Sequence, residues 1–230
     1  MLTLSQPCFA TGVYLRTLGE ISKKLFMNKL EKFIINPTNE FHILRHFRYV
    51  DDYYKKTLIG QLYWFYDYGQ KKFVSSKISQ IDIENALKTI GTKFEKNIIG
   101  IESPKKLLEI IKNRFQELLS NNKIYWIDNL EYKTIAFTFD YQFFVGQMNC
   151  LNKDSILERD KNRIKPVLKS KCAGENAVIV NTISDIELSS TKSIHVEIVE
   201  TKQLPFYTIT AFPDCSLSDD IPDENIVFVV

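Results

Sequence analysis

The stretch SIHVEIVETKQLPFYTITAF, residues 193–212, shows most clearly how the second half of this 230-residue chain folds. Polar and apolar side chains alternate along Ser193–Thr201 and again along Phe206–Phe212. A period of two predicts β-strands, because successive side chains on a strand point to opposite faces. Only Lys202–Pro205 separates the two runs. We therefore expect an antiparallel hairpin.

The same alternation assigns side chains to faces. His195 and Glu197 share one face of the first strand, and Thr208 and Thr210 share one face of the second. The two polar faces coincide when the strands pair. The sequence thus predicts an imidazole, a carboxylate and two hydroxyls on one exposed sheet surface.

Other runs with strand character surround this hairpin. Lys123–Asp128 and Tyr132–Asp140 are expected to form a second hairpin, and Tyr141–Val145 to continue or restart that strand up to Gly146. A further strand is expected in Asn176–Thr182, and the tail Ile226–Val230 would add a last edge strand.

The first half has a helical pattern. Apolar residues recur at three-to-four spacing over Leu15–Ile35, before a turn at residues 36–39. A second, ring-rich helix is expected over Phe41–Tyr68 with Gly69 as its stop, and a short one over Ile81–Ile90. The clearest helix starts with Ser103 as its N-cap and Pro104 at its first position. Its buried stripe would be Leu107, Leu108, Ile111, Phe115, Leu118 and Leu119, with an end at residues 120–122.

This order predicts an α+β fold: a helical, basic and aromatic-rich region over residues 1–122, then a small antiparallel sheet domain with short helices over residues 123–230. A composition of 44% hydrophobic and 13% aromatic residues excludes a mainly disordered chain. Charges interrupt every apolar run before about 20 residues, so no membrane span is expected. The first residues lack the pattern of a secretory signal, which predicts a cytoplasmic protein. The four cysteines are far apart, so we expect neither a zinc site nor a disulfide framework.

The net charge of +2 conceals an asymmetry. In residues 1–122, 19 basic minus 12 acidic residues gives +7, and in residues 123–230, 11 minus 16 gives −5. Within the acidic half, residues 153–171 form a basic segment in which 7 − 3 gives +4. Such a local basic loop is expected for phosphate contact, and a solvated charged loop is the alternative. Its basic residues are Lys153, Arg159, Lys161, Arg163, Lys165, Lys169 and Lys171.

Two motifs in the first half suggest a metal but lack the remaining ligands. Tyr49-Val50-Asp51-Asp52 is similar to the metal-binding box of reverse transcriptases, yet neither an upstream palm strand nor an apolar strand after it is present, so we interpret it as a helix surface. His42 and His46 have the i, i+4 spacing of a metal-binding pair. No further ligand stands nearby, so packing or solvent-facing histidines are expected.

The groups on the predicted sheet face are sufficient for RNA cleavage without a metal. A neutral imidazole such as His195 can take the proton of the ribose 2′-OH, while lysine or arginine stabilises the charge that builds on the phosphate.

The second half also resembles a known group of nucleases. Val145-Gly146 followed by Cys150, the basic segment with Arg159 and Arg163, and residues 207–213 (YTITAFP) occur in the order found in the barnase/EndoU/colicin/RelE-like superfamily. The resemblance is to its branch at the C-termini of phage MuF-type and polymorphic toxin proteins, and it covers residues 123–224. Pro166 interrupts the basic segment, which is a departure from that pattern.

The resemblance implies a small antiparallel sheet with helices on one face. It also implies an endoribonuclease that needs no metal or other cofactor and leaves a 2′,3′-cyclic phosphate. Thr210 matches the strand threonine of the family, and Arg159 and Arg163 fall in its basic segment. His195 is added as a catalytic candidate from the sheet-face argument alone. The expected RNA contacts are Lys161, Lys165, Lys169, Lys171 and Thr208.

The predicted function is therefore an RNase toxin of phage, plasmid or defence origin, with RNA such as tRNA as substrate and an antitoxin or immunity protein as a partner. The alternative is a non-enzymatic phage or defence protein that binds and inhibits a protein partner. The aromatic first half could grip RNA, dock an antitoxin or only support packing, and we expect most of its rings to be core.

Overall fold

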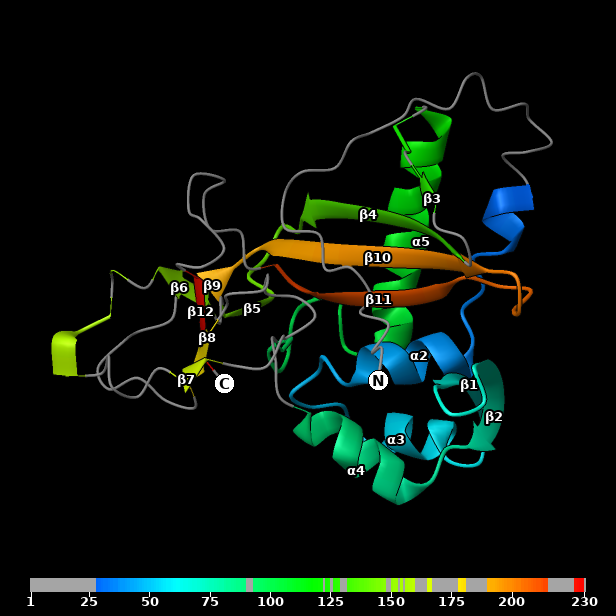
Figure 1. Ribbon diagram of the computed structural model, residues 1–230, viewed down its shortest axis with the longest axis horizontal. Helices are drawn as coiled ribbons and strands as arrows, with labels where there is room; N and C mark the ends of the chain where they lie inside the picture. The colour runs from blue at the N-terminus through cyan, green and yellow to red at the C-terminus, as the bar shows by residue number, and fades with distance from the viewer. Residues whose placement is uncertain are drawn as a thin grey trace.

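The chain has an α+β fold, seen in a computed structural model that describes residues 28–89, 93–121, 123–124, 126–128, 132–147, 150–152, 154, 156–159, 165–166, 178–180, 190–214 and 226–229 (Figure 1). Helices and antiparallel strands both occur, as the sequence predicts.

The central sheet has the strand order β11-β10-β4-β3. It contains β3 (Ile127–Asp128), β4 (Tyr132–Asp140), β10 (Ser193–Thr201) and β11 (Thr208–Pro213), and all its pairs are antiparallel. The pairing of both predicted hairpins is confirmed, with the predicted bounds for β4 and β10. Of the strand predicted over Lys123–Asp128, β3 contains only Ile127–Asp128. β11 begins two residues later and ends one residue later than expected.

Helix α5 (Pro104–Ser120) forms the other side of the core. Ser103 caps it as predicted by accepting from the backbone N–H of Lys106, and Figure 1 shows α5 crossing behind β4, β10 and β11. Phe115 lies 5.5 Å from Phe33 and 6.0 Å from Tyr207, measured between ring centroids. One hydrophobic core therefore contains residues from both sides of residue 122.

Helix α2 (Pro37–Leu44) packs against the β11 edge of the sheet. Asn36 is its N-cap and Pro37 its first residue, so the predicted turn at residues 36–39 also starts this helix. Inside the helix, Asn39 Nδ2 donates to the carbonyl of Tyr207, and Asn39 Oδ1 accepts from the N–H of Ile209. An edge strand has unpaired backbone groups, and this amide satisfies two of them.

The prediction of one helix over Phe41–Tyr68 is wrong. The segment contains the end of α2, helix α3 (Asp52–Leu58) and strand β1 (Leu62–Asp67), which pairs with β2 (Lys72–Lys77). Asp67 accepts hydrogen bonds from the backbone N–H groups of Gly69 and Gln70, so Gly69 belongs to a hairpin turn and does not end a helix. Aromatic residues favour strands, and a run of rings fits either period.

The remaining helices agree with the prediction in part. Helix α4 (Gln80–Lys88) begins with a capping box between Ser79 and Asp82. Residues 28–31 are helical but residues 32–35 are not, so the helix predicted over Leu15–Ile35 ends earlier than expected, and residues 15–27 lie outside the described residues.

Two smaller sheets contain short strands. One has the order β6 (Cys150–Asn152), β12 (Ile226–Val229), β8 (Val178–Val180), β7 (Lys165–Pro166). β12 lies between two neighbours, so the expectation of an edge strand at the tail is wrong. The other pairs β5 (Gly146–Gln147) with β9 (Ser190–Thr191). The expectation of a strand at Tyr141–Val145 is therefore wrong, because those residues are not in a strand and Gly146, the expected stop, is the first residue of β5. Within the described ranges, no helix is long and apolar enough to cross a membrane.

Candidate functional site

The candidate site lies on the polar face of the β10–β11 hairpin. The register pairs Glu197 with Thr210 and Val199 with Thr208, which places these side chains on one face as the alternation predicts. His195 stands on the same face, between Phe212 of β11 and Thr138 of β4. The core face of the same strands is apolar, so each strand separates packing from polar chemistry.

His195 has contacts at both ring nitrogens. Its Nδ1 lies 3.1 Å from Thr138 Oγ1, and its Nε2 lies 3.6 Å from a carboxylate oxygen of Glu197. The second distance is too long for a hydrogen bond but close enough for electrostatic attraction. The side chain of Glu197 is only 7% exposed, against 17% for His195. The face is therefore less exposed than the sequence suggests.

Two further imidazoles reach this face from the first half of the chain. His46 follows α2, and its Nε2 lies 3.3 Å from Thr210 Oγ1. The ring of Phe212 lies 5.4 Å from the ring of His46 and 5.1 Å from that of His195, measured between centroids. Phe212 thus packs against both imidazoles.

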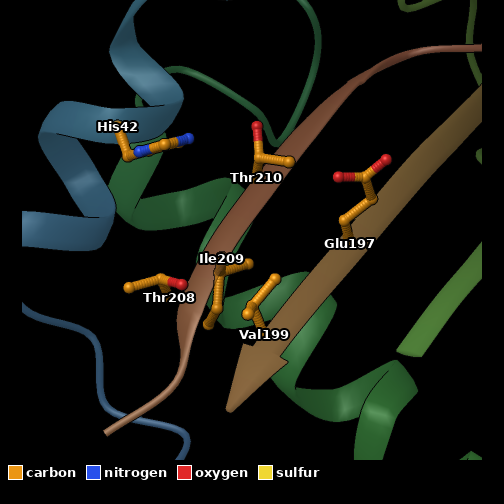
Figure 2. A pocket seen from close by; sticks show the side chains of 6 residues that line it. All are labelled: His42, Glu197, Val199, Thr208, Ile209 and Thr210. Atoms are coloured by element: carbon orange, nitrogen blue, oxygen red, sulfur yellow. The ribbon is translucent and has the colours of Figure 1, made fainter. Parts of the chain in front are cut away.

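His42 is one helical turn before His46 and lines a partly open hollow with room for about one water molecule. Figure 2 shows its ring between α2 and the hairpin, with the side chains of Thr210, Thr208 and Glu197 around the same space. Typical small-molecule pockets enclose roughly 300–1,000 Å³. The hollow is therefore too small to enclose a ligand, and a ligand of this face would lie on its surface.

The surroundings of His42 favour its neutral form. Burial lowers the pKa of His42 well below its usual value, and the positive charges of Arg45 and His46 lower it further. A neutral imidazole at neutral pH can accept a proton. Glu197, an acidic residue, lines the same hollow.

Lys93, Arg45 and Arg48 form a group of basic residues beside His46. Lys93 donates to the backbone carbonyls of Arg45 and Leu87, which lie at the ends of α2 and α4. Burial, with Arg48 and Arg45 nearby, lowers the pKa of Lys93 to about 8. Burial also lowers the pKa of Arg45. Arg48 forms an ion pair with Glu95 at 3.0 Å.

Of the residues predicted from the sequence, the structure brings His195, Thr208 and Thr210 onto one face. Arg159 is exposed in a short turn, and Lys165 is in β7, which belongs to a different sheet. The other predicted site residues, Arg163, Lys161, Lys169 and Lys171, lie outside the described residues.

His42 and His46 are the site residues that sequence reasoning missed. Their spacing was visible, but it predicted a metal pair or packing and gave no sign of a partner 164 residues away. The small number of histidines was a usable signal, because the chain has 3 and all of them border this face. No group of three or more His, Cys, Asp or Glu side chains suited to a metal occurs in the part of the chain that the structure describes.

The aspartates of residues 49–52 have structural roles. Asp51 caps α3 by accepting from the N–H of Tyr54 at 2.7 Å, and Asp52 pairs with Lys55 at 2.8 Å. Val50 is fully buried. These contacts explain the sequence of the motif without a metal.

The face brings together imidazoles, which can accept or donate protons near neutral pH, with a carboxylate and hydroxyls. No protein-family model, curated protein or solved structure matches the chain. The resemblance to the nuclease superfamily therefore stays a prediction, and a function can be inferred only from the geometry of these side chains.

Proposed function

We propose that this chain is a metal-independent endoribonuclease, a cytoplasmic toxin of phage, plasmid or defence origin that cleaves cellular RNA. The observation that carries the proposal is the meeting of three imidazoles, His42, His46 and His195, around Thr210 and Phe212. Imidazole is the side chain best suited to proton transfer near neutral pH.

The reaction needs one proton acceptor and one proton donor. The acceptor takes the proton of the ribose 2′-OH, and the 2′-oxygen forms a bond to phosphorus. The bond from phosphorus to the 5′-oxygen breaks, and the donor protonates that leaving oxygen. The products are a 2′,3′-cyclic phosphate and a free 5′-OH, so no water, metal or oxidant enters this step.

The geometry supports particular roles for these groups. His42 is the acceptor in this proposal, because its surroundings keep it neutral and it borders the hollow. His195, whose Nε2 faces the Glu197 carboxylate, is the donor, with Glu197 as a positioning residue. His46 Nε2 and Thr210 Oγ1, which lie 3.3 Å apart, contact the phosphate side by side in this proposal.

The cation that stabilises the phosphate has two proposed sources. Arg45 is the C-cap of α2, and its positive charge acts on His42. Arg159 and Arg163 of the basic segment are the second source, as the nuclease resemblance implies. The hollow is too small to enclose a small molecule, which favours a polymer laid across the surface. An antitoxin or immunity protein is the partner that a toxin of this kind requires.

The test is cleavage of total RNA by the purified chain in the presence of EDTA, analysed on a denaturing gel. We expect discrete fragments with cyclic phosphate ends, and a loss of about 100-fold or more in rate for His195→Ala and for His42→Ala, the usual effect of removing an acid or base. Arg159→Ala and Arg163→Ala test the second source of the cation. Unchanged RNA with the wild-type chain would favour the non-enzymatic binding protein.

A further inference from the structure

The β1–β2 hairpin exposes a row of aromatic side chains on one of its faces. Leu62, Trp64 and Tyr66 alternate along β1, and the register places Phe73, Ser75 and Lys77 beside them on β2. Tyr68, in the turn, extends the row, with its ring centroid 5.1 Å from that of Tyr66. We call these residues the aromatic face.

The opposite face of the hairpin anchors it to the rest of the molecule. Tyr63 packs on Phe41 of α2 with ring centroids 4.7 Å apart, and Phe65 stacks on Tyr63 at 5.4 Å. The backbone is tied down as well, because the N–H of Trp64 donates to Thr38 and the N–H of Phe73 donates to Gln203. The hairpin is thus held by α2, which contains His42, and by the β10–β11 turn, which leads into Thr208 at the start of β11.

The aromatic face is open to solvent. Trp64 is 40% exposed, Leu62 56% and Tyr68 56%. A two-stranded hairpin has little stability of its own, and exposing large rings on it is unfavourable. A surface of this kind is usually an interaction site.

The charges around the rings indicate the kind of partner. Lys77 is exposed on the aromatic face and Lys71 is exposed in the turn beside it, whereas Lys72 is opposite Asp67 on the other face. The one carboxylate of the hairpin, Asp67, is occupied by the amides of its turn. Lysine is depleted at the centres of protein–protein interfaces, whereas rings combined with lysine are typical of surfaces on which nucleic-acid bases stack.

We propose that the aromatic face binds single-stranded RNA, with bases stacked on Trp64 and Tyr68 and phosphates near Lys71 and Lys77. The six residues of β1 span about 20 Å, and sheets that recognise RNA stack two or three bases on such a surface. The inference rests on the proposed function for the identity of the ligand, and it adds a binding surface separate from the residues that cleave.

The binding test uses the full chain with His195→Ala, so that cleavage cannot consume the probe. A short fluorescein-labelled oligouridylate is titrated, and its anisotropy gives Kd. We expect Trp64→Ala and Tyr68→Ala each to weaken binding about fivefold or more, and Lys77→Ala to reduce its dependence on salt. The matched control is Tyr53→Ala, because Tyr53 is 81% exposed but lies on α3 outside the hairpin. This control should leave Kd unchanged.

A second readout is independent of affinity. The chain has 2 tryptophans, and Trp126→Phe leaves Trp64 as the single one. Base stacking should quench its emission as the oligouridylate is added. Circular dichroism and a thermal melt of each variant show whether the fold is intact.

The outcomes separate this inference from the proposed function. If hairpin variants bind like the control, or Trp64 emission does not respond, the RNA-binding face is wrong even when the wild-type chain cleaves RNA. If they lose binding while the wild-type chain leaves all RNA intact, the face stands and the nuclease proposal fails. A variant that loses its fold is replaced by Trp64→Phe, which should weaken binding less than Trp64→Ala would.

Discussion

The side chain of Asn39 on α2 hydrogen-bonds the backbone on both sides of Thr208: its Nδ2 donates to the carbonyl of Tyr207 at 2.9 Å, and its Oδ1 accepts from the N–H of Ile209 at 3.0 Å. The same Nδ2 donates to the carbonyl of Ile34. Asn39 is fully buried. This one amide fixes α2, and with it His42, against the strand that carries Thr210.

Replacing Asn39 should destabilise the fold. Asn39→Ala leaves two buried backbone groups, at Tyr207 and Ile209, without this partner, and each costs about 1–3 kcal/mol. It also removes the donor to the part-buried carbonyl of Ile34. We expect a loss of about 3 kcal/mol or more in the free energy of unfolding, measured by urea denaturation. Asn85→Ala, at an exposed position on α4, is the control and should change it by less than about 0.5 kcal/mol. Equal stability of the two variants would show that Asn39 does not hold the edge.

Neighbouring tyrosines on α3 offer a second matched comparison. The hydroxyl of Tyr54 donates to Glu40 at 2.6 Å in a buried pair, whereas Tyr53 is exposed. Tyr54→Phe leaves the Glu40 carboxylate buried without this donor, so we expect a loss of about 2 kcal/mol. Tyr53→Phe should be neutral. The measurement is the shift in Tm, and a neutral Tyr54→Phe would contradict the importance of the pair.

Gly146 has no room for a side chain. A Cβ there would lie 2.6 Å from the carbonyl oxygen of Lys93 and 2.7 Å from Pro213. Gly146→Ala should therefore push β5 away from Lys93 and Pro213, at a cost of about 1–3 kcal/mol. Gly69→Ala is the milder comparison, because its Cβ would meet only the Asp67 side chain at 3.2 Å. Thermal melts that rank the two variants the other way would rule out this packing.

The parts of the fold that sequence predicted are those with strong local signals. Ser103-Pro104 and the apolar stripe of α5 depend on residues close in sequence, as does the alternation in β10. The face shared by Glu197 and Thr210 followed from that alternation and a short turn, and the register confirms it.

The parts that sequence could not predict depend on distant contacts. Nothing near His46 indicates Thr210, because the contact exists only when α2 packs on the edge of β11. The rings of β1 fit a helix or a strand until the turn at Asp67 is recognised. The preference for core rings in the first half was right for Phe33, Phe47, Tyr54, Phe94 and Phe115 and wrong for Tyr49, Tyr53, Trp64, Phe65 and Tyr68.

The contact between Thr210 and His46 gives a test of the site that leaves its volume unchanged. Thr210→Val removes the hydroxyl that faces His46 Nε2, while Thr210→Ser keeps it. If the hydroxyl helps to hold the phosphate, Thr210→Val should lower kcat/KM for RNA cleavage about tenfold, which corresponds to about 1.4 kcal/mol. Thr210→Ser should retain most activity. Equal activity of the two variants would exclude a role for the hydroxyl.

The lowered pKa of His42 makes a prediction about stability and pH. In the folded chain His42 stays neutral where the unfolded chain, with an ordinary histidine pKa of about 6.5, takes up a proton. The unfolded state therefore binds more protons as the pH falls through about 6.5, and its stability relative to the folded state rises. Folded His42 contributes stability that is present above about pH 6.5 and is lost below it. The slope approaches about 1.4 kcal/mol per pH unit.

The measurement is urea unfolding of the wild-type chain and His42→Gln between about pH 5 and 8. Burial is the main cause of the lowered pKa, and the charges of Arg45 and His46 add to it; Glu197 is the acidic residue that lines the same hollow. We expect the wild-type chain to lose stability more steeply than His42→Gln below about pH 6.5, and the two curves to run parallel above it. In an NMR titration, the His42 ring signals should shift only well below pH 6.5. A signal that titrates at an ordinary value would remove the basis for His42 as the proton acceptor.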